Sequence, residues 1–261
     1  MYITSTKNPQ IKHIKQLQSK SKQRLNENSF VVEGVREVEM ALKSNFVFKK
    51  VFISKDQYQS NLRFSENTQI IEISSEVYNH IAYRSSTEGI LAICESKIHS
   101  LENLKLETHN PLIIVVESPE KPGNLGAILR TADAANVDAV IISNPRTDFY
   151  NPNTVRSSLG AVFSNQIASA KSEQVIQYLH DHKVNIYAAT LQNSNSYLKY
   201  DYKRPTAFAM GSEALGLSDI WRNREDIKAI NIPMNGEIDS MNLSVSTAIL
   251  TFEAVRQRAN G

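Results

Sequence analysis

The stretch of sequence that decides the fold is Ile230-Asn231-Ile232-Pro233-Met234-Asn235-Gly236-Glu237-Ile238-Asp239-Ser240-Met241-Asn242-Leu243-Ser244-Val245-Ser246-Thr247-Ala248-Ile249. A short apolar strand ending at Ile232 meets Pro233, which cannot donate a hydrogen bond to a neighbouring strand, so the chain must leave the sheet there. A polar loop follows, and Ser240 or Asn242 can then cap a helix whose apolar residues recur at helical spacing. Proteins of the α/β class build ligand sites in this way, because loop amides and a positive helix end are exposed at the carboxyl edge of the sheet.

Length and composition indicate a soluble protein of two domains. The chain has 261 residues, of which 41% are hydrophobic and 21% charged, enough apolar material for a real core. The one cysteine, Cys94, lies in an apolar run and is expected in a buried strand, where it cannot form an internal disulfide. No run reaches the roughly 18 apolar residues of a membrane span, and the N-terminus lacks a signal peptide. We therefore expect a cytoplasmic protein with no membrane association.

The first 26 residues form a basic arm, with no acidic residue before Glu27. Its basic residues are Lys7, Lys12, Lys15, Lys20, Lys22 and Arg24. Such an arm favours a polyanion such as RNA, because each phosphate contact releases condensed counterions. The alternative is the solvated face of a helix.

Two α/β patterns follow one another along the chain. In the first, the expected strands are 30–34, 47–54, 69–73 and 90–94, and the expected helices are 8–18, 35–43 and 74–82. The pattern breaks between residues 95 and 111, where we place a linker. In the second, the expected strands are 112–116, 139–142, 185–190, 206–210 and 229–232, and the expected helices are 125–135, 171–180 and 243–258. The continuous apolar run 112–116 is typical of a parallel strand covered on both faces. We therefore expect domains at 1–106 and 107–261.

A motif from Glu117 to Ala135 places an arginine on a helix. Asn124 is a good N-cap, and an apolar stripe beginning at Leu125 faces the sheet. At 100° per residue, Arg130 lies about 140° around the helix from Leu125 and therefore leaves the core. Its guanidinium can there meet a phosphate or a ribose, and a solvated arginine is the alternative.

Two further motifs combine glycine with polar residues. Arg156-Ser157-Ser158-Leu159-Gly160-Ala161 is small, polar and basic, which suits close approach to a backbone, but a simple loop or helix start would look the same. In the other motif, the strand 206–210 runs into Gly211, which lets a ligand approach the main chain. Glu213 is exposed just past the carboxyl end of that strand, where functional residues often lie.

The sequence lacks the residue patterns that mark several common enzyme classes. No G-x-G-x-x-G or G-x-x-x-x-G-K-S/T occurs, so dinucleotide and P-loop sites have no support. The six histidines never pair with cysteine or acid at zinc-ligand spacing, and we expect no metal. Ser-His-Asp catalysis lacks a G-x-S-x-G elbow, and Cys94 in an apolar strand makes a poor nucleophile.

With these motifs in order, the second half resembles the SpoU (TrmH-like) branch of the SPOUT superfamily of RNA 2'-O-ribose methyltransferases, over about residues 110–259. The family's three motifs correspond to residues 124–130, to residues 210–213, and to residues 232–234 with 240–246. Met241 departs from the leucine usual in the family, but methionine keeps the volume and the apolar character.

The first hundred residues resemble, less specifically, the ribosomal-protein-like RNA-binding domain that many family members carry. Phe30-Val31-Val32-Glu33-Gly34-Val35-Arg36 is its most recognisable part. The resemblance thus implies an RNA substrate-binding domain followed by a SpoU-type methyltransferase domain.

The resemblance also implies a fold, a cofactor and an assembly. The implied C-terminal domain is α/β with a mainly parallel sheet and a deep trefoil knot, and it forms a homodimer in which the partner subunit contributes to each site. The implied cofactor is S-adenosylmethionine, held largely by main-chain groups. The implied contact residues are Gly211, Ile232 and Met241, with Thr190, Leu191 and Leu243 close by.

The implied reaction is methyl transfer to a ribose 2'-hydroxyl of structured RNA, with ribosomal RNA preferred and transfer RNA as an alternative. Arg130 is implied to assist at the hydroxyl, although a guanidinium is an awkward base. We expect Arg130 to bind the adjacent phosphate and the developing alkoxide, oriented with the ribose by Asn124, Glu213, Ser240 and Asn242. The final proton acceptor stays open. A non-catalytic RNA-binding or ribosome-assembly factor, and a base methyltransferase, are the rival functions.

Overall fold

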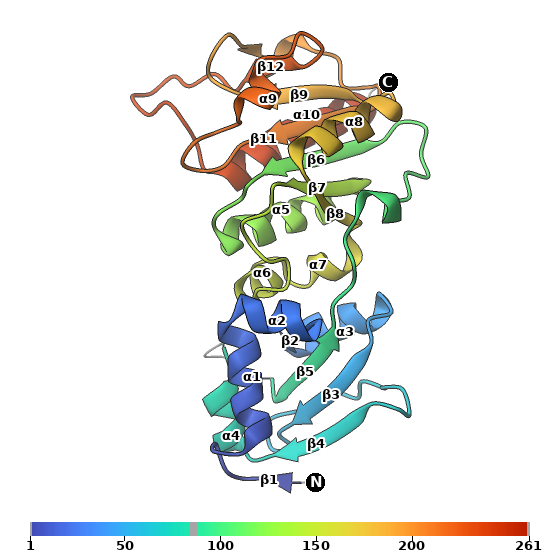
Figure 1. The fold of residues 1–261 in the computed structure, drawn as a ribbon, viewed down its shortest axis with the longest axis vertical. Coiled ribbons are helices and arrows are strands. Elements are labelled where there is room, and N and C mark those ends of the chain that lie inside the picture. Colours follow the sequence, from blue (N-terminus) through green and yellow to red (C-terminus); the bar gives the residue numbers. More distant parts are fainter. Residues whose placement is uncertain (1, 84–87, 260–261) are drawn as a thin grey trace. The chain divides into compact units, whose positions relative to one another are not determined.

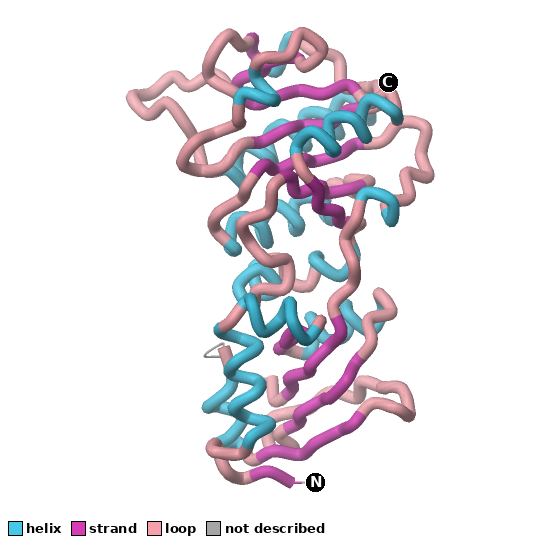
Figure 2. Tube along the Cα trace, viewed as in Figure 1, coloured by secondary structure: helices cyan, strands magenta, loops and turns pink. Residues whose placement is uncertain are grey.

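The computed structural model describes residues 2–83 and 88–259, which fall into two compact units (Figure 1). The first unit contains the chain up to residue 98 together with residues 148–164. The second contains residues 99–147 and the chain from residue 165 onward. Strands and helices alternate along the chain in both units, as the sequence predicts (Figure 2).

The first unit is built on a mixed five-stranded sheet with the order β1-β4-β3-β5-β2. Strand β5 runs antiparallel to β2 and β3, whereas β4 pairs in parallel with β1 and β3. The strands are β1 (Tyr2–Ile3), β2 (Ser29–Glu33), β3 (Phe48–Ile53), β4 (Gln69–Ile73) and β5 (Ile90–Glu95). The helices are α1 (Pro9–Ser19), α2 (Ser21–Glu27), α3 (Val35–Lys43) and α4 (Ser75–Ile81). Cys94 is buried in β5, as predicted.

Helix α1 belongs to the core of this unit. Its residues Ile11, Ile14 and Leu17 are fully buried against the sheet. The predicted basic arm therefore belongs to the folded unit. The prediction that its basic residues favour RNA is wrong for one of them, Arg24. Arg24 is 3% exposed, because its guanidinium donates to the Asp148 carboxylate at 2.5 Å and to the Leu17 carbonyl at 2.6 Å. Arg24 cannot contact RNA in this conformation, whereas the five lysines of the arm are exposed.

Residues 148–164 complete the core of the first unit. They form α6 (Pro152–Ser157) and α7 (Ala161–Ser164). The Tyr150 ring stacks on Phe30 with 4.0 Å between centroids, and Phe163 packs edge-on against Phe46 at 5.1 Å. The Arg156 motif therefore spans the end of α6 and the start of α7, in a segment that packs into the core of the first unit.

The second unit is built on a seven-stranded sheet with the order β10-β12-β9-β11-β6-β7-β8, in which every pair is parallel. The strands are β6 (Leu112–Glu117), β7 (Ala139–Ser143), β8 (Ile167–Ala170), β9 (Asn185–Ala189), β10 (Asn195–Ser196), β11 (Thr206–Met210) and β12 (Lys228–Asn231). The α-helices are α5 (Pro122–Ala134), α8 (Ser172–Asp181), α9 (Asp219–Arg222) and α10 (Leu243–Ala259), and two short 3₁₀ turns are η1 (Leu101–Asn103) and η2 (Tyr197–Lys199).

Helices cover both faces of this sheet. Helices α8 and α9 pack on the face that carries Ile113 and Val115, where Trp221 is fully buried. Helices α5 and α10 pack against each other on the opposite face (Figure 1). The apolar run 112–116 is buried throughout, which confirms the predicted parallel strand.

Much of the segment predicted as a linker belongs to the second unit. Leu101, Leu104 and Leu106 pack against its core, and the His99 carbonyl accepts a 2.9 Å hydrogen bond from the Ser169 amide. None of the helices in the described ranges is long and apolar enough to cross a membrane.

Candidate cofactor and active site

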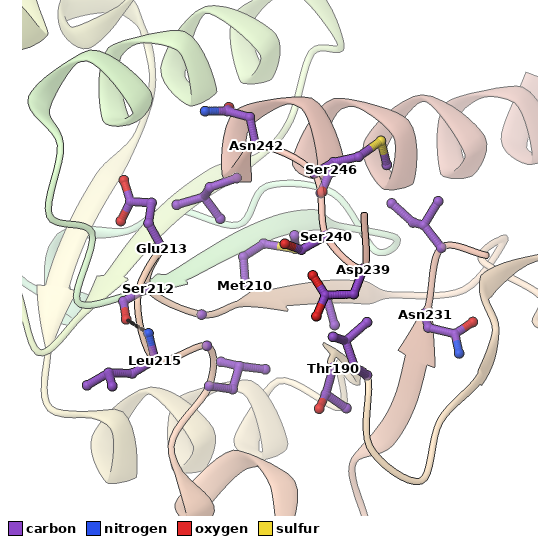
Figure 3. A pocket seen from close by; sticks show the side chains of 18 of the residues that line it. Thr190, Met210, Ser212, Glu213, Leu215, Asn231, Asp239, Ser240, Asn242 and Ser246 are labelled. Carbon is purple, nitrogen blue, oxygen red and sulfur yellow. Dashed lines mark hydrogen bonds between the residues drawn. The ribbon is translucent and has the colours of Figure 1, made fainter. Parts of the chain in front are cut away.

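A cavity of about 560 Å³ opens at the carboxyl ends of β9, β11 and β12 in the second unit (Figure 3). Three segments supply most of its lining, at residues 189–192, 210–217 and 230–243. Ligands bind at this edge of parallel sheets because the strands end there and the following loops are free to vary. The volume is that of a typical small-molecule site.

The main chain after β11 forms one wall, and only glycine fits at its start. A Cβ atom on Gly211 would lie 2.0 Å from the Gly216 carbonyl carbon and 2.1 Å from the Leu217 nitrogen. This close approach is held by two hydrogen bonds of 3.1 and 3.0 Å between the amides and carbonyls of Ser212 and Gly216. Gly216 has a φ of +67°, and the space where its side chain would lie is open. The turn therefore presents backbone to the cavity.

The loop between β12 and α10 forms the opposite wall. Strand β12 ends at Asn231, one residue earlier than predicted and two residues before Pro233. Asn242 caps α10, because its Oδ1 accepts from the Ser244 amide at 2.9 Å and from the Ser244 hydroxyl at 2.7 Å. Ser240, the other expected cap, is exposed and lines the cavity.

Three predicted polar residues meet beside the cavity. The Asn124 side-chain amide donates to Glu213 Oε1 at 2.6 Å, and the Asn242 amide donates to Asn124 Oδ1 at 3.2 Å. Glu213 also accepts from the backbone amides of Glu120 at 3.1 Å and Lys121 at 3.3 Å. Three elements far apart in sequence are therefore joined at one point by side chains.

The role predicted for Asn124 as an N-cap is wrong. Helix α5 begins at Pro122, and Lys121 occupies the cap position. Proline is favoured at the first helical position because its fixed φ suits the helix and its missing N–H is not needed there. Asn124 consequently lies in the first turn, where its side chain reaches Glu213.

The surroundings of Glu213 favour its ionised form. Partial burial alone would raise the pKa of Glu213, but hydrogen bonds from Asn124 and from the amides of Glu120 and Lys121 outweigh it and lower the pKa. The carboxylate therefore stays charged at neutral pH and accepts from Asn124.

Arg130 stands apart from this cluster. It is exposed on α5, as predicted from the helix stripe, and no other described residue pairs with its guanidinium. It does not line the cavity of its own chain. Of the five predicted catalytic residues, Glu213, Ser240 and Asn242 line the cavity and Asn124 contacts two of them.

All six residues predicted for the cofactor line the cavity: Thr190, Leu191, Gly211, Ile232, Met241 and Leu243. The lining also contains residues that the sequence analysis missed, among them Lys121, Gln192, Met210, Ser212, Arg222, Asn231, Asp239 and Ser246. The open backbone at Gly216 and the apolar side chains fit an adenine ring and the aliphatic chain of a sulfonium cofactor held mainly by main-chain groups. Within the described ranges, no three His, Cys, Asp or Glu side chains are grouped to hold a metal ion.

Comparison with known proteins agrees with this site. Residues 111–252 match the SpoU rRNA Methylase family, and residues 8–92 match the MRM3-like substrate binding domain. The 23S rRNA (guanosine(2553)-2'-O)-methyltransferase RlmP of Bacillus subtilis is 30% identical over 250 residues, which are 96% of this chain and 97% of that protein.

Solved structures are similar over nearly the whole chain. A crystal structure of an RNA 2'-O ribose methyltransferase superposes with a TM-score of 0.84 at 33% identity, covering 99% of this chain and 100% of the other. An AdoMet-bound rRNA methyltransferase from Sinorhizobium meliloti gives a TM-score of 0.88 at 29% identity, covering 98% and 97%. This chain therefore belongs to the SpoU rRNA methylase family and is an S-adenosylmethionine-dependent RNA methyltransferase.

Proposed function

We propose that this protein transfers a methyl group from S-adenosylmethionine to a ribose 2'-hydroxyl of ribosomal RNA. The observation that carries the proposal is the contact of Asn124, Glu213 and Asn242 at the rim of a cavity whose lining includes every residue predicted for the cofactor. The Bacillus subtilis relative, which is named for a 23S rRNA guanosine, supports ribosomal RNA as the substrate. Transfer RNA and a non-catalytic assembly role are the alternatives.

The chain's own residues hold and position the reactants. We propose that Gly211, Ile232 and Met241 contact the cofactor, with Thr190, Leu191 and Leu243 beside it. S-adenosylmethionine supplies an already activated methyl group, so proximity and orientation can provide most of the acceleration. The ionised Glu213 fixes the Asn124 amide, and Asn124 in turn accepts from Asn242, so these groups are oriented before RNA arrives.

We propose that the site is completed in a homodimer formed through the C-terminal domain. Two observations support this. Arg130 lies outside the cavity of its own chain, yet it is the cation expected to bind the phosphate and the developing alkoxide. Helix α10 also exposes apolar side chains, with Val245 at 47% and Phe252 at 45% exposure and Ile249 between them. In the dimer, Arg130 of each subunit serves the cavity of the partner, and Ser240 helps orient the ribose.

We also propose a fold for the site, in which the C-terminal segment is threaded as the deep trefoil knot that the family resemblance implies. The match of residues 111–252 to the SpoU rRNA Methylase family supports this. We also propose a cytoplasmic location, which the single cysteine, the buried Cys94, and the RNA substrate support.

We further propose that residues 1–106 bind the RNA substrate and residues 107–261 carry the methyltransferase. The match of residues 8–92 to a substrate-binding domain supports this division, as do the exposed lysines of α1 and α2. Lysines that contact phosphates bind RNA without reading its sequence.

Mapping 2'-O-methyl nucleotides in total RNA, from cells with and without this protein, tests the proposal directly. We expect one site in the large ribosomal RNA to lose its methyl group, and purified protein to restore it with S-adenosylmethionine. A site lost from transfer RNA would replace the substrate, and loss of a base methyl instead of a ribose methyl would replace the reaction. An unchanged methylation map would contradict both.

A further inference from the structure

The cavity contains an acidic side chain to which the methyl-transfer proposal gives no role. Asp239 lies in the loop between β12 and α10 and lines the cavity. Figure 3 shows its carboxylate turned into the cavity, on the side where Thr190 lies in this view and away from Glu213. No hydrogen-bond donor or cation from the described part of the chain pairs with it.

The other charged residues of the lining differ from Asp239. Glu213 is occupied by the Asn124 amide and two backbone amides, and Arg222 donates to Asp219 at 2.7 Å. Lys121 is a cation and cannot attract a positive ligand group. Asp239 is thus the one carboxylate among the described lining residues that is free to bind a cation.

S-adenosylmethionine carries two positive groups, the sulfonium and the α-ammonium of its methionine part. A carboxylate at the sulfonium would stabilise the bound donor more than the transition state, because the sulfonium charge is lost during transfer. The ammonium keeps its charge, so a carboxylate there stabilises both states equally. In the view of Figure 3, Asp239 lies on the opposite side of the cavity from Glu213, which also favours a group remote from the reacting methyl. Building on the proposed function, we propose that Asp239 binds the α-ammonium group of the cofactor.

The test compares three ligands by calorimetry on the full-length protein. S-adenosylhomocysteine keeps the ammonium and lacks the sulfonium charge, and 5'-methylthioadenosine lacks the whole amino-acid part. We expect Asp239→Asn to weaken S-adenosylmethionine and S-adenosylhomocysteine about tenfold each, and to leave 5'-methylthioadenosine unchanged, because one charge-assisted hydrogen bond is lost. The matched control is Glu237→Gln, an exposed carboxylate of the same loop outside the cavity lining, which should leave all three affinities unchanged.

Other outcomes overturn the assignment. Equal affinities for wild type and Asp239→Asn would make the carboxylate a solvated loop residue. Weaker binding of S-adenosylmethionine alone would place Asp239 at the sulfonium, and weaker binding of all three ligands would place it at the ribose or reveal a disturbed loop. In steady-state assays the KM for the cofactor should rise with kcat unchanged, because the contact is uniform. If the wild-type protein binds none of the three ligands, the cofactor assignment itself fails, which is a distinct result.

Discussion

The side-chain amide of Asn124 donates a 2.6 Å hydrogen bond to the Glu213 carboxylate, and this bond joins α5 to the loop after β11. The two residues are 89 positions apart in sequence. Because Asn242 reaches the same asparagine, the N-terminal ends of α5 and α10 are joined beside the cavity. A substitution of Glu213 should therefore affect catalysis by changing how the linked side chains of Asn124 and Asn242 are positioned.

Glu213→Gln keeps the shape of the side chain but removes its charge. We expect methyl transfer to fall about tenfold to a hundredfold, because an amide accepts more weakly from Asn124 and turns an NH₂ group toward the backbone amides. Cofactor affinity should change little. Single-turnover transfer to a defined RNA, with calorimetry of cofactor binding, measures the two effects. A variant with wild-type turnover would show that the Asn124 contact does not position the reactants.

The lowered pKa of Glu213 also predicts a pH dependence of stability. A carboxylate whose pKa is lower in the folded than in the unfolded state stabilises the fold above the unfolded pKa, and this stabilisation is lost as pH falls through the folded pKa. We expect the unfolding temperature of the wild type to exceed that of Glu213→Gln at neutral pH. The gap should close in acid. Thermal melts of both proteins from neutral pH downward would show it, and a gap that widens in acid contradicts the assignment.

Gly211→Ala tests the close packing of the turn. Its Cβ would lie 2.0 Å from the Gly216 backbone, so the loop must move and the cavity wall with it. We expect cofactor affinity to fall about tenfold or more, with a loss of about 1–3 kcal/mol in the free energy of unfolding. Gly236→Ala is the control, because nothing lies within 4 Å of its added Cβ. Calorimetry that finds both variants equal to wild type would mean that the turn is not held as tightly as described.

The five exposed lysines of the basic arm, three of them in α1 and α2, predict salt-dependent RNA binding. Deleting the arm would remove Ile11 and Ile14 from the core, so side-chain substitution is the suitable test. We expect Lys12→Gln with Lys22→Gln to weaken RNA binding and to lower the slope of log K against log salt by about 1–2, while cofactor binding stays unchanged. Arg24 is excluded because it is buried. An unchanged slope would show that these lysines are solvated and do not contact RNA phosphates.

Much of the fold could be predicted because most elements carry a local pattern. The run 112–116 is apolar throughout, and 35–43 repeats at helical spacing, so both were predicted at nearly the right bounds. Helix α2 was missed because Arg24 is its only buried residue, and β8 was missed because it has four residues, three of them small. Local pattern is weak in such short elements, and tertiary packing decides them.

In the candidate site too, the features with a local pattern could be predicted, and those that depend on tertiary packing could not. Four of the six expected cofactor residues follow strand ends, where the chain must turn, and the other two lie at or just before the start of α10; all six line the cavity. The contact between Asn124 and Glu213 could not be predicted, because it depends on how distant segments pack. Asp239 was overlooked because an acidic residue in a polar loop resembles an ordinary solvated side chain.

Arg130 is exposed on α5 and lies outside the cavity of its own chain. Its exposure on α5 means that Arg130→Ala should leave the fold and cofactor binding nearly intact, while methyl transfer falls about a hundredfold or more. Arg130→Lys should restore little of the rate, because lysine lacks the planar fork that binds a phosphate at two points. Near-normal single-turnover transfer by the alanine variant would remove Arg130 from the catalytic set, and rescue by lysine would show that a point charge suffices.

In the proposed homodimer, mixing two impaired variants decides which subunit's cavity Arg130 serves. In a heterodimer of Arg130→Ala and Glu213→Gln, the subunit with intact Glu213 faces an intact Arg130 only if that arginine acts across the dimer. Random exchange then restores about a quarter of wild-type activity, because half of the dimers are mixed and each has one complete site. If Arg130 serves its own chain, both sites of the mixed dimer are defective, and the mixture should be no more active than its components. Activity titrated against the mixing ratio, with subunit exchange verified by mass, distinguishes the two arrangements.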